Sequence, residues 1–493
     1  MKRLVGRILG MAATTVPERT AVTLGTEART FMQVERAANR LAHVLIGRGV
    51  RPGDRVMTWC SISIEDPALY FAILRCGATY VPMNPAYSDQ EAENAIGYIE
   101  PHLLIADVDH MERAQSIFVR CVLLDGGERA ESLLCEAATA SETLPDVGNI
   151  DEEAIESIFL TSGSTGTPKG VMVSHRATWN RMLGRSRNDL CGAAGEVSMF
   201  PMFHFAGWAM LLSSWAYRRP LHMVRSASAE EILGAAERWR AGVLYAIPSI
   251  WERLLAAQSC YDLKCVRYAL TGTSRVEPEL MRRIGTAFPE ARLGVLYGST
   301  EMGGALAIYE EDVWRKPLSV GMPYPGFEAK ISDGELLLRS DTVMSGYFRL
   351  PETTAAVMDG DWYRSGDLAE RDAEGFYTIT GRRSEVIRSG GEYIAPAEVE
   401  AALRDAPGVG DVAVLGLPDS AWGEIICAAV VPAGDCAPPD VAALRAHLAT
   451  RLASFKHPRR VELVTSLPRT QATGQVQRSA IRKIIISRST ADG

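Results

Sequence analysis

The feature that most restricts the fold is a short apolar segment followed at once by a loop of small and hydroxyl residues. Residues 155–160 (IESIFL) are typical of a buried strand, and residues 160–171 (LTSGSTGTPKGV) follow it directly. Glycines let backbone N–H groups approach a phosphate, hydroxyls donate to its oxygens, and Lys169 adds a positive charge. The P-loop pattern is not met, because Gly170 rather than Ser or Thr follows Lys169. The segment predicts a phosphate-binding loop at the end of a strand.

Strand-like and helix-like segments alternate through the first part of the chain. Residues 54–59 and 78–83 are typical of strands, and the helical spacing of residues 64–76 lies between them. The strand pattern recurs at 155–160, 196–203, 220–224, 242–247 and 293–297. Strands separated by helices favour parallel sheets, so the predicted fold class is α/β.

The pattern changes twice towards the C-terminus. From about residue 318 short strands with Gly and Pro turns indicate a β-rich subdomain, as at 335–340 and 375–380. A new α/β pattern then begins, with helices near 396–405 and 439–454 and strands near 411–416 and 425–432. We therefore predict an N-terminal domain of residues 1–383 and a C-terminal domain of residues 384–493.

Composition excludes several classes of function. The 493 residues carry a net charge of −8, which argues against a general nucleic-acid binder. The sequence has no apolar run of about 18 residues, so no membrane span is expected. Arg7 interrupts the apolar N-terminal stretch, which favours the first helix of a cytoplasmic protein over a signal peptide.

Cysteine and histidine spacing excludes further classes. The nine cysteines form no C-x-x-C pair, so buried reduced thiols are expected. The eight histidines form no H-x-x-x-H pair, which argues against a dedicated zinc site. The absence of G-x-S-x-G argues against a serine hydrolase of the elbow type.

Five further motifs follow the loop at 160–171, and together they resemble a known family. They are YGSTE (297–301), YRSGDL (363–368), GRRSEVIRSGGEYIAPAEVE (381–400), LPDSAWGE (417–424) and LPRTQATGQVQR (467–478). In this order they resemble the adenylate-forming superfamily of acyl- and aryl-CoA synthetases, luciferases and peptide-synthetase adenylation domains. The resemblance covers nearly the whole chain. It implies a large N-terminal α/β domain with a β-rich subdomain and a small, mobile α+β C-terminal lid.

The resemblance implies a site for ATP and Mg²⁺. Lys169 and Thr300 would be catalytic, with Thr300 bonding the α-phosphate, and Glu301 would help to hold Mg²⁺, which prefers hard carboxylate oxygens. The implied nucleotide-binding residues of these two motifs are Thr161, Ser162, Gly163, Ser164, Thr165, Gly166, Gly298 and Ser299.

The ribose and adenine positions follow from the same resemblance. Asp367 would accept both ribose hydroxyls, and Arg382 would bond the ribose or the phosphates; Asp367 alone could equally be a turn residue. Thr271 and Gly272 resemble the loop that cradles adenine, although the family usually has Gly-Gly-Ala-Pro there. Tyr297 would stack on the adenine, or else belong to the core.

The acyl pocket is expected around residues 201–210 (PMFHFAGWAM). The implied pocket residues are His204, Phe205, Met302 and Gly303. Amino-acid-activating relatives commonly have an Asp after the Phe of this segment, whereas here His204 follows Phe203. An uncompensated ammonium group would be costly in an apolar pocket, which favours a plain carboxylic acid, medium-chain fatty or aryl. His204 could alternatively be a packed residue, and Trp208 and Trp215 either shorten the pocket or belong to the core.

The predicted lid carries the acceptor site and one departure from the family pattern. Ser389, Gly390 and Gly391 would bind CoA by allowing close approach of its pantetheine arm, and Ser384 stands at the hinge. Gln475 occupies the position of the catalytic lysine that bridges the substrate carboxylate and the α-phosphate. Gln keeps a hydrogen-bond donor but has no charge.

The predicted reaction converts a carboxylic acid and ATP to acyl-AMP and pyrophosphate, and then transfers the acyl group to CoA. One alternative is transfer to a carrier-protein thiol, or a reaction that stops at the adenylate. Another is a weakened or inactive nucleotide-binding homologue, because Gln475 replaces the lysine. A monomer or homodimer that uses ATP, Mg²⁺ and CoA is expected.

Overall fold

The computed structural model describes residues 2–126, 131–161, 169–185, 194–389, 392–419, 422–434, 437–470 and 474–491. They form two compact units. The first comprises residues 1–317, 323–328 and 339–361, and the second comprises residues 318–322, 329–338 and 362–493. The second unit thus joins the β-rich segments to the C-terminal region. The functional domain boundary at residues 383–384 stays a prediction.

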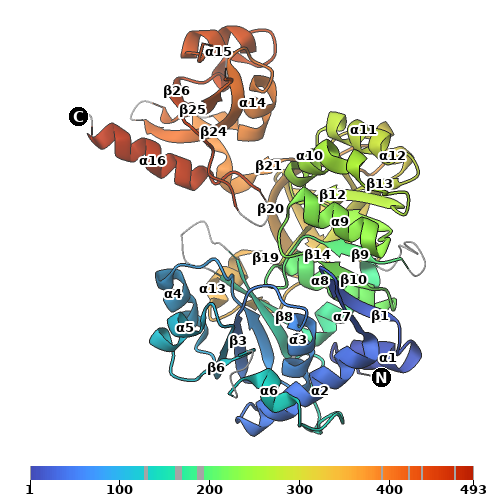
Figure 1. Ribbon diagram of the computed structural model, residues 1–493. Coiled ribbons are helices and arrows are strands. Elements are labelled where there is room, and N and C mark those ends of the chain that lie inside the picture. The colour runs from blue at the N-terminus through green and yellow to red at the C-terminus, as the bar shows by residue number, and fades with distance from the viewer. Residues whose placement is uncertain are drawn as a thin grey trace. The chain divides into compact units, whose positions relative to one another are not determined.

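The first sheet of the first unit carries the apolar strand of the predicted phosphate loop. Its order is β18-β8-β7-β4-β3-β5-β6. Strands β3, β6 and β8 of this sheet are labelled in Figure 1. The strands are β3 (Arg55–Trp59), β4 (Thr79–Pro82), β5 (Leu103–Ala106), β6 (Cys121–Leu123), β7 (Ile155–Thr161), β8 (Lys169–Ser174) and β18 (Gly346–Tyr347). Strands β6, β5, β3, β4 and β7 pair in parallel, and β8 is antiparallel to β7. The α/β class is confirmed.

The second sheet of this unit carries the YGSTE motif at the end of a strand. Strands β9 to β13 and β1 pair in parallel, and antiparallel β2 and β14 flank them. The strands are β1 (Thr20–Leu24), β2 (Glu27–Thr30), β9 (Glu196–Ser198), β10 (Leu221–Met223), β11 (Val243–Tyr245), β12 (Tyr268–Gly272), β13 (Arg292–Ser299) and β14 (Gly303–Tyr309). Strand β9 ends earlier than the predicted 196–203, before Pro201, which has no N–H for a ladder.

Helices connect the strands of the first unit. They are α1 (Arg7–Thr15), α2 (Phe31–Gly47), α3 (Asp66–Arg75), α4 (Asp89–Ile99), α5 (Met111–Ile117), α6 (Leu133–Ala137), α7 (His175–Arg185), α8 (Phe205–Ala216), α9 (Ala229–Trp239), α10 (Pro248–Ala257), α11 (Pro278–Ala287), α12 (Glu311–Arg315) and α13 (Pro351–Ala356). Sequence signals set their starts: Ser88 and Glu91 form a capping box at α4, as Thr30 and Gln33 do at α2. The N-terminal segment forms α1, as predicted.

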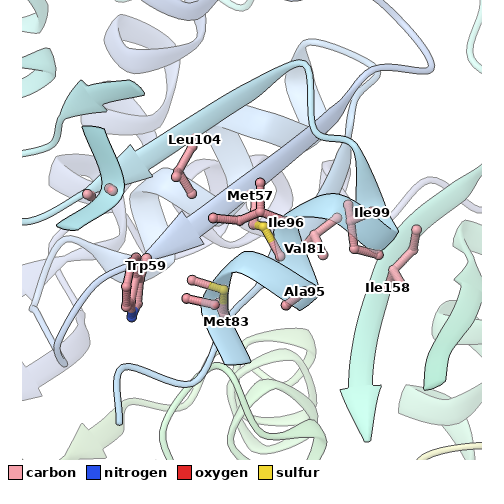
Figure 2. Packing of buried hydrophobic residues seen from close by; sticks show 12 residues of the cluster. Met57, Trp59, Val81, Met83, Ala95, Ile96, Ile99, Leu104 and Ile158 are labelled. Atoms are coloured by element: carbon pink, nitrogen blue, oxygen red, sulfur yellow. The ribbon is translucent and has the colours of Figure 1, made fainter. Parts of the chain in front are cut away.

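The core beside the first sheet is built from strands that are apolar on both faces. Met57, Val81, Leu104 and Ile158 come from four neighbouring strands, and Ile96 comes from α4 (Figure 2). All five side chains are buried. Such burial is expected for parallel strands, whose two faces are both covered by helices.

The second unit contains two sheets. The β-rich part has β15 (Ser319–Pro323), β16 (Glu328–Ser332), β17 (Glu335–Arg339), β20 (Trp362–Arg371) and β21 (Tyr377–Arg382). The C-terminal part has β22 (Ile387–Ser389), β23 (Glu392–Ile394), β24 (Val409–Asp419), β25 (Gly423–Pro432) and β26 (Arg460–Leu463), with helices α14 (Pro396–Leu403), α15 (Val441–Leu448) and α16 (Arg478–Ala491).

Strand β24 shows why the C-terminal sheet is covered on both faces. Val412 and Val414 pack in one apolar cluster with residues of α14 and α15. Ala413 and Leu415 pack in another with Ile485 of α16, shown in dark red in Figure 1. Successive side chains of a strand point to opposite faces, so this apolar run serves two cores at once.

Two further expectations concern absences. Among the described residues, none of the helices is apolar and long enough to traverse a membrane. The described cysteines form no disulfide, as expected. Cys135 and Cys260 are exposed, however, because Cys135 lies on the solvent side of the short helix α6, whose Leu133 and Ala137 are buried, and Cys260 ends a 3-10 segment without buried residues.

Candidate active site

The two ends of the predicted phosphate loop are joined by a strand ladder. Thr161 ends β7 and lies opposite Lys169, which begins β8. The Thr161 hydroxyl donates to the Lys169 carbonyl over 3.3 Å. The predicted loop residues Ser162, Gly163, Ser164, Thr165 and Gly166 lie outside the described residues. The ladder therefore fixes the position of Lys169, where the chain enters β8, beside Thr161, after which the loop begins.

Tyr347 connects two predicted catalytic residues. The Lys169 Nζ atom lies 5.2 Å from the centroid of the Tyr347 ring. The Tyr347 hydroxyl donates to Glu301 Oε1 over 3.1 Å. Tyr347 reaches this position because β18 pairs with β8, which places it opposite Val171. Sequence reasoning missed Tyr347, since the segment SGYF around it has no motif that marks a site.

The YGSTE motif ends in a tight turn between β13 and β14. A Cβ atom on Gly298 would lie 2.2 Å from the Gly303 carbonyl oxygen, so only glycine allows the two strands to approach so closely. Gly303 has a φ of +82°, in the region that favours glycine. The turn holds Thr300 and Glu301 between the two strands, where both are half-buried.

The adenine loop lies beside the same motif. Strands β12 and β13 are parallel, with Gly272 opposite Leu296, the residue before Tyr297. A Cβ atom on Gly272 would lie 2.2 Å from the Leu296 carbonyl oxygen, so this position also requires glycine. Thr273, which departs from the family pattern, has a φ of +66°, a conformation that costs free energy for a β-branched residue.

Two buried hydroxyls in these strands indicate a polar ligand. The side-chain oxygens of Thr271 and Ser299 are buried, and neither has a hydrogen-bond partner. A buried polar atom without a partner is costly, and a bound polar group removes that cost. Both hydroxyls belong to predicted nucleotide-binding motifs. The residues present thus fit a nucleotide.

His204 is a neutral cap of helix α8. Its Nδ1 accepts a hydrogen bond from the Ala206 N–H over 3.1 Å, and its ring stacks on Phe200 with centroids 5.3 Å apart. Burial lowers the pKa of His204 to about 4, so the imidazole is uncharged at neutral pH. His204 is thus a packed residue, and its place beside the acyl group stays a prediction.

The other predicted pocket residues meet at one arginine. The Arg181 guanidinium lies 5.2 Å from the centroid of the Phe205 ring. A Cβ atom on Gly303 would lie 3.1 Å from Arg181 Cγ, and Met302 beside it is fully buried. The structure therefore places Phe205 and Gly303 against Arg181, which the sequence analysis did not name, with Met302 next to Gly303 in the chain.

The two tryptophans of α8 are core residues. Trp215 is fully buried, and its Nε1 donates to the Ala21 carbonyl over 2.9 Å. Trp208 is also buried and packs behind Phe205, with ring centroids 5.6 Å apart.

Asp367 and Arg382 form a pair in the second unit. They lie opposite each other on β20 and β21, and Arg382 Nε lies 2.9 Å from Asp367 Oδ1. Arg382 also donates to the Ser365 carbonyl over 3.1 Å. Asp367 is buried, so it is held by the sheet and is not a mobile turn residue.

The remaining predicted residues lie in the same unit. Ser384 is exposed in a short 3-10 segment, residues 383–385, and Ser389 ends β22. Gly390 and Gly391 lie outside the described residues. The Gln475 N–H donates to the Thr470 hydroxyl over 3.0 Å, and its carbonyl accepts from the Thr470 N–H over 2.8 Å. These bonds hold the backbone of Gln475 at the surface.

Comparison with known proteins identifies the family. A model of the AMP-binding enzyme matches residues 10–348, and a model of the AMP-binding enzyme C-terminal domain matches residues 398–473. The feruloyl-CoA synthase of an Amycolatopsis species is 32% identical over 95% of this chain and 96% of its own. The long-chain-fatty-acid–CoA ligase FadD13 of Mycobacterium tuberculosis is 30% identical over 97% and 98%.

A solved structure agrees with these matches. ATP-bound MatB from Rhodopseudomonas palustris has a TM-score of 0.89 to this chain at 27% identity, covering 98% of this chain and 99% of its own. The chain belongs to the AMP-binding enzyme family, whose two domain models both match it. The predicted fold and the predicted enzyme class, an AMP-forming acid–thiol ligase, are confirmed.

Proposed function

We propose that the protein activates a carboxylic acid with ATP and transfers the acyl group to CoA. The observation that carries this proposal is the cluster of Lys169, Tyr347 and Glu301 at the end of the phosphate loop. A cation and a carboxylate that contact the same tyrosine can serve a phosphate and its metal ion. Relatives named as CoA synthases and ligases support CoA as the acceptor.

In the first half of the reaction, a carboxylate oxygen attacks the α-phosphorus of ATP, and pyrophosphate leaves. Lys169 and Thr300 stabilise the charge that develops on the phosphate oxygens. Glu301 would hold Mg²⁺, which would supply charge neutralisation there. In the second half, the CoA sulfur attacks the acyl carbon, AMP leaves, and the thiol proton is lost to solvent.

Asp367 and Arg382 are proposed to bind the ribose. The ion pair between them holds the Asp367 carboxylate in one orientation, and the buried carboxylate offers two oxygens to the two ribose hydroxyls. Thr271, Gly272 and Tyr297 are proposed to hold the adenine. The unpartnered Thr271 hydroxyl supports this assignment.

The lid residues keep their predicted roles as part of the proposal. Ser389, Gly390 and Gly391 would receive the pantetheine arm, and Ser384 would be the hinge. Gln475 would stand between the carboxylate and the α-phosphate. A neutral amide makes weaker bonds to both groups than lysine does, so adenylation would be the slow half-reaction.

The proposed substrate has an uncharged tail, aryl or medium-chain. Two observations support this class: His204 is neutral, and Phe205 presents an aromatic ring packed against Phe159 and Trp208. No carboxylate follows Phe203 that could compensate an ammonium group. Among relatives, the names feruloyl-CoA synthase and long-chain-fatty-acid–CoA ligase cover both kinds of tail.

The test is pyrophosphate release with ATP, Mg²⁺ and a panel of acids, with and without CoA, followed by mass spectrometry of the products. Acyl-AMP without CoA and acyl-CoA with it are expected. Acyl-AMP that accumulates despite CoA, and disappears with a carrier protein, would favour the carrier alternative. ATP binding without pyrophosphate release from any acid would favour an inactive homologue.

A further inference from the structure

Arg181 is a buried cation in helix α7 that belongs to none of the motifs. Its side chain is 6% exposed, and the helix places it inward against the β13–β14 turn. Burial lowers the pKa of Arg181 to about 10, so the guanidinium stays charged at neutral pH. A buried charge is costly unless it is paired and hydrogen-bonded, so its partners show what it does.

Those partners are backbone carbonyls of two separate segments. Arg181 donates from Nη1 to the Thr300 carbonyl over 3.1 Å and from Nη2 to the Glu301 carbonyl over 3.0 Å. Its Nε donates to the Thr342 carbonyl over 2.8 Å. The planar guanidinium thus ties the two reactive residues of YGSTE to the segment at 342.

The segment at 342 leads directly to Tyr347, which holds the Glu301 carboxylate. Two more bonds join it to the turn: the Thr342 hydroxyl donates to the Met302 carbonyl over 2.9 Å, and the Met344 N–H donates to the Glu301 carbonyl over 2.6 Å. Arg181 therefore fixes both the backbone of Glu301 and the segment that orients its side chain.

The charge of Arg181 is balanced by two carboxylates. Glu156 and Glu301 both favour its charged form. Glu156 is fully buried and accepts from the hydroxyls of Tyr70, Ser157 and Thr178, and burial raises its pKa to about 7. Glu156 can take up a proton when its cation is removed, so a neutral residue at position 181 can be accommodated.

We propose that Arg181 is a positioning residue that holds Thr300 and Glu301 in the geometry needed for the α-phosphate and the metal ion. The expected effect on the reaction rate rests on the proposed function. The positioning of Thr300 and Glu301 can be measured without catalysis. The acyl pocket is affected too, because the same guanidinium faces Phe205 and its stem covers Gly303.

The test compares Arg181→Met, Arg181→Lys and the control Arg176→Met. Arg176 lies on the same helix, but its side chain is 34% exposed and pairs with Glu153 at the surface. In Arg181→Met we expect kcat/KM for ATP to fall by about 10–100-fold, since small misplacement of reacting groups has such costs. The Mg²⁺ concentration for half-maximal rate should rise. Arg181→Lys should not restore either value, because one ammonium nitrogen cannot span three carbonyls.

Amide hydrogen exchange in the absence of substrates gives a readout independent of function. Arg181→Met should speed exchange at residues 299–304 and 342–347 and leave strand β12 and the control variant unchanged. If Arg181→Met does not fold, Arg181→Met/Glu156→Gln removes both buried charges and is compared in its place. Unchanged exchange and an unchanged Mg²⁺ requirement, or full rescue by lysine, would overturn the proposal. If the wild-type protein is inactive but amide exchange is still faster in Arg181→Met, only the proposed function is refuted, and the positioning role of Arg181 stands.

Discussion

At the scale of single residues, the candidate active site combines side chains from separate segments of the chain. Lys169 comes from the strand after the phosphate loop, Glu301 from the YGSTE turn, and Tyr347 from a two-residue strand. The Tyr347 ring lies beside Lys169 Nζ, and its hydroxyl binds Glu301. One tyrosine thus contacts both predicted catalytic side chains.

Lys169→Ala and Glu301→Ala test this arrangement. Each removes a charged group that stabilises the transition state, so each should slow pyrophosphate release by on the order of 10²–10³-fold. Both side chains are half-buried, so the melting temperature should change little. Unchanged release rates in both variants would contradict the site assignment.

Gln475→Lys tests the departure from the family pattern. A lysine can make charge-assisted bonds to both the carboxylate and the phosphate, so adenylation should accelerate by on the order of 10²–10³-fold. Thioester formation from supplied acyl-AMP should hardly change, because that step contains no attack of a carboxylate on a phosphate for residue 475 to assist. The measurement is each half-reaction separately, in the native and substituted proteins.

If native adenylation is already fast and Gln475→Lys alters nothing, another residue supplies the charge. Lys456 is a poor candidate, since its Nζ already pairs with Glu398 in the same unit.

At the scale of elements, helix α7 connects the phosphate loop strand to the YGSTE turn. It begins at His175, directly after β8, and carries Arg181 inward. His175 Nδ1 accepts a hydrogen bond from the Val5 N–H over 3.3 Å, which ties the start of α7 to the N-terminal segment. That bond requires an unprotonated Nδ1, and burial lowers the pKa of His175 to about 4.

The pH dependence of stability tests the buried state of His175. Between pH 6.5 and about 4, the His175 side chain binds a proton in the unfolded chain but not in the folded chain. The contribution of neutral His175 to the free energy of unfolding is therefore complete above pH 6.5 and is lost as the pH falls. His175→Asn should remove this loss, which is at most about 3 kcal/mol. Denaturant unfolding from pH 7.5 to 4.5 measures it, and native and variant curves that stay parallel would disprove it. His204 and His222 remain in both proteins and cancel in the comparison.

At the scale of the whole molecule, the residues proposed to bind the phosphates, the metal ion and the acyl group lie in the first unit, and Asp367, Arg382 and Gln475 lie in the second. The proposed reaction needs groups from both units. In the proposed function, a substrate preference reflects the predicted pocket residues of the first unit, His204 and Phe205 among them.

Substrate class is the prediction at this scale. Neutral-tailed acids should exceed α-amino acids of similar size in kcat/KM by at least about 100-fold, because burying an unpaired ammonium group costs several kcal/mol. Competition assays with matched pairs, such as an arylpropanoic acid and its α-amino derivative, measure this ratio. Preference for the amino acid would show that a carboxylate elsewhere compensates the ammonium group.

The sequence by itself determined the fold class, the order of the motifs and the enzyme class. Alternating strand and helix patterns predict parallel sheets, and short runs of residue types such as YGSTE carry the resemblance that implied the enzyme class. These features depend on local periodicity and on single residue types, so they can be read along the chain.

Only the tertiary structure decided which side chains meet. Arg181 contacts carbonyls of residues about 120 and 161 positions away, and Tyr347 contacts Glu301 across 46 positions. Nothing in the surrounding sequence distinguishes this arginine from Arg176 on the same helix, which stays at the surface. The difference arises because burial of a residue depends on what packs against its helix face, and that packing comes from segments distant in sequence.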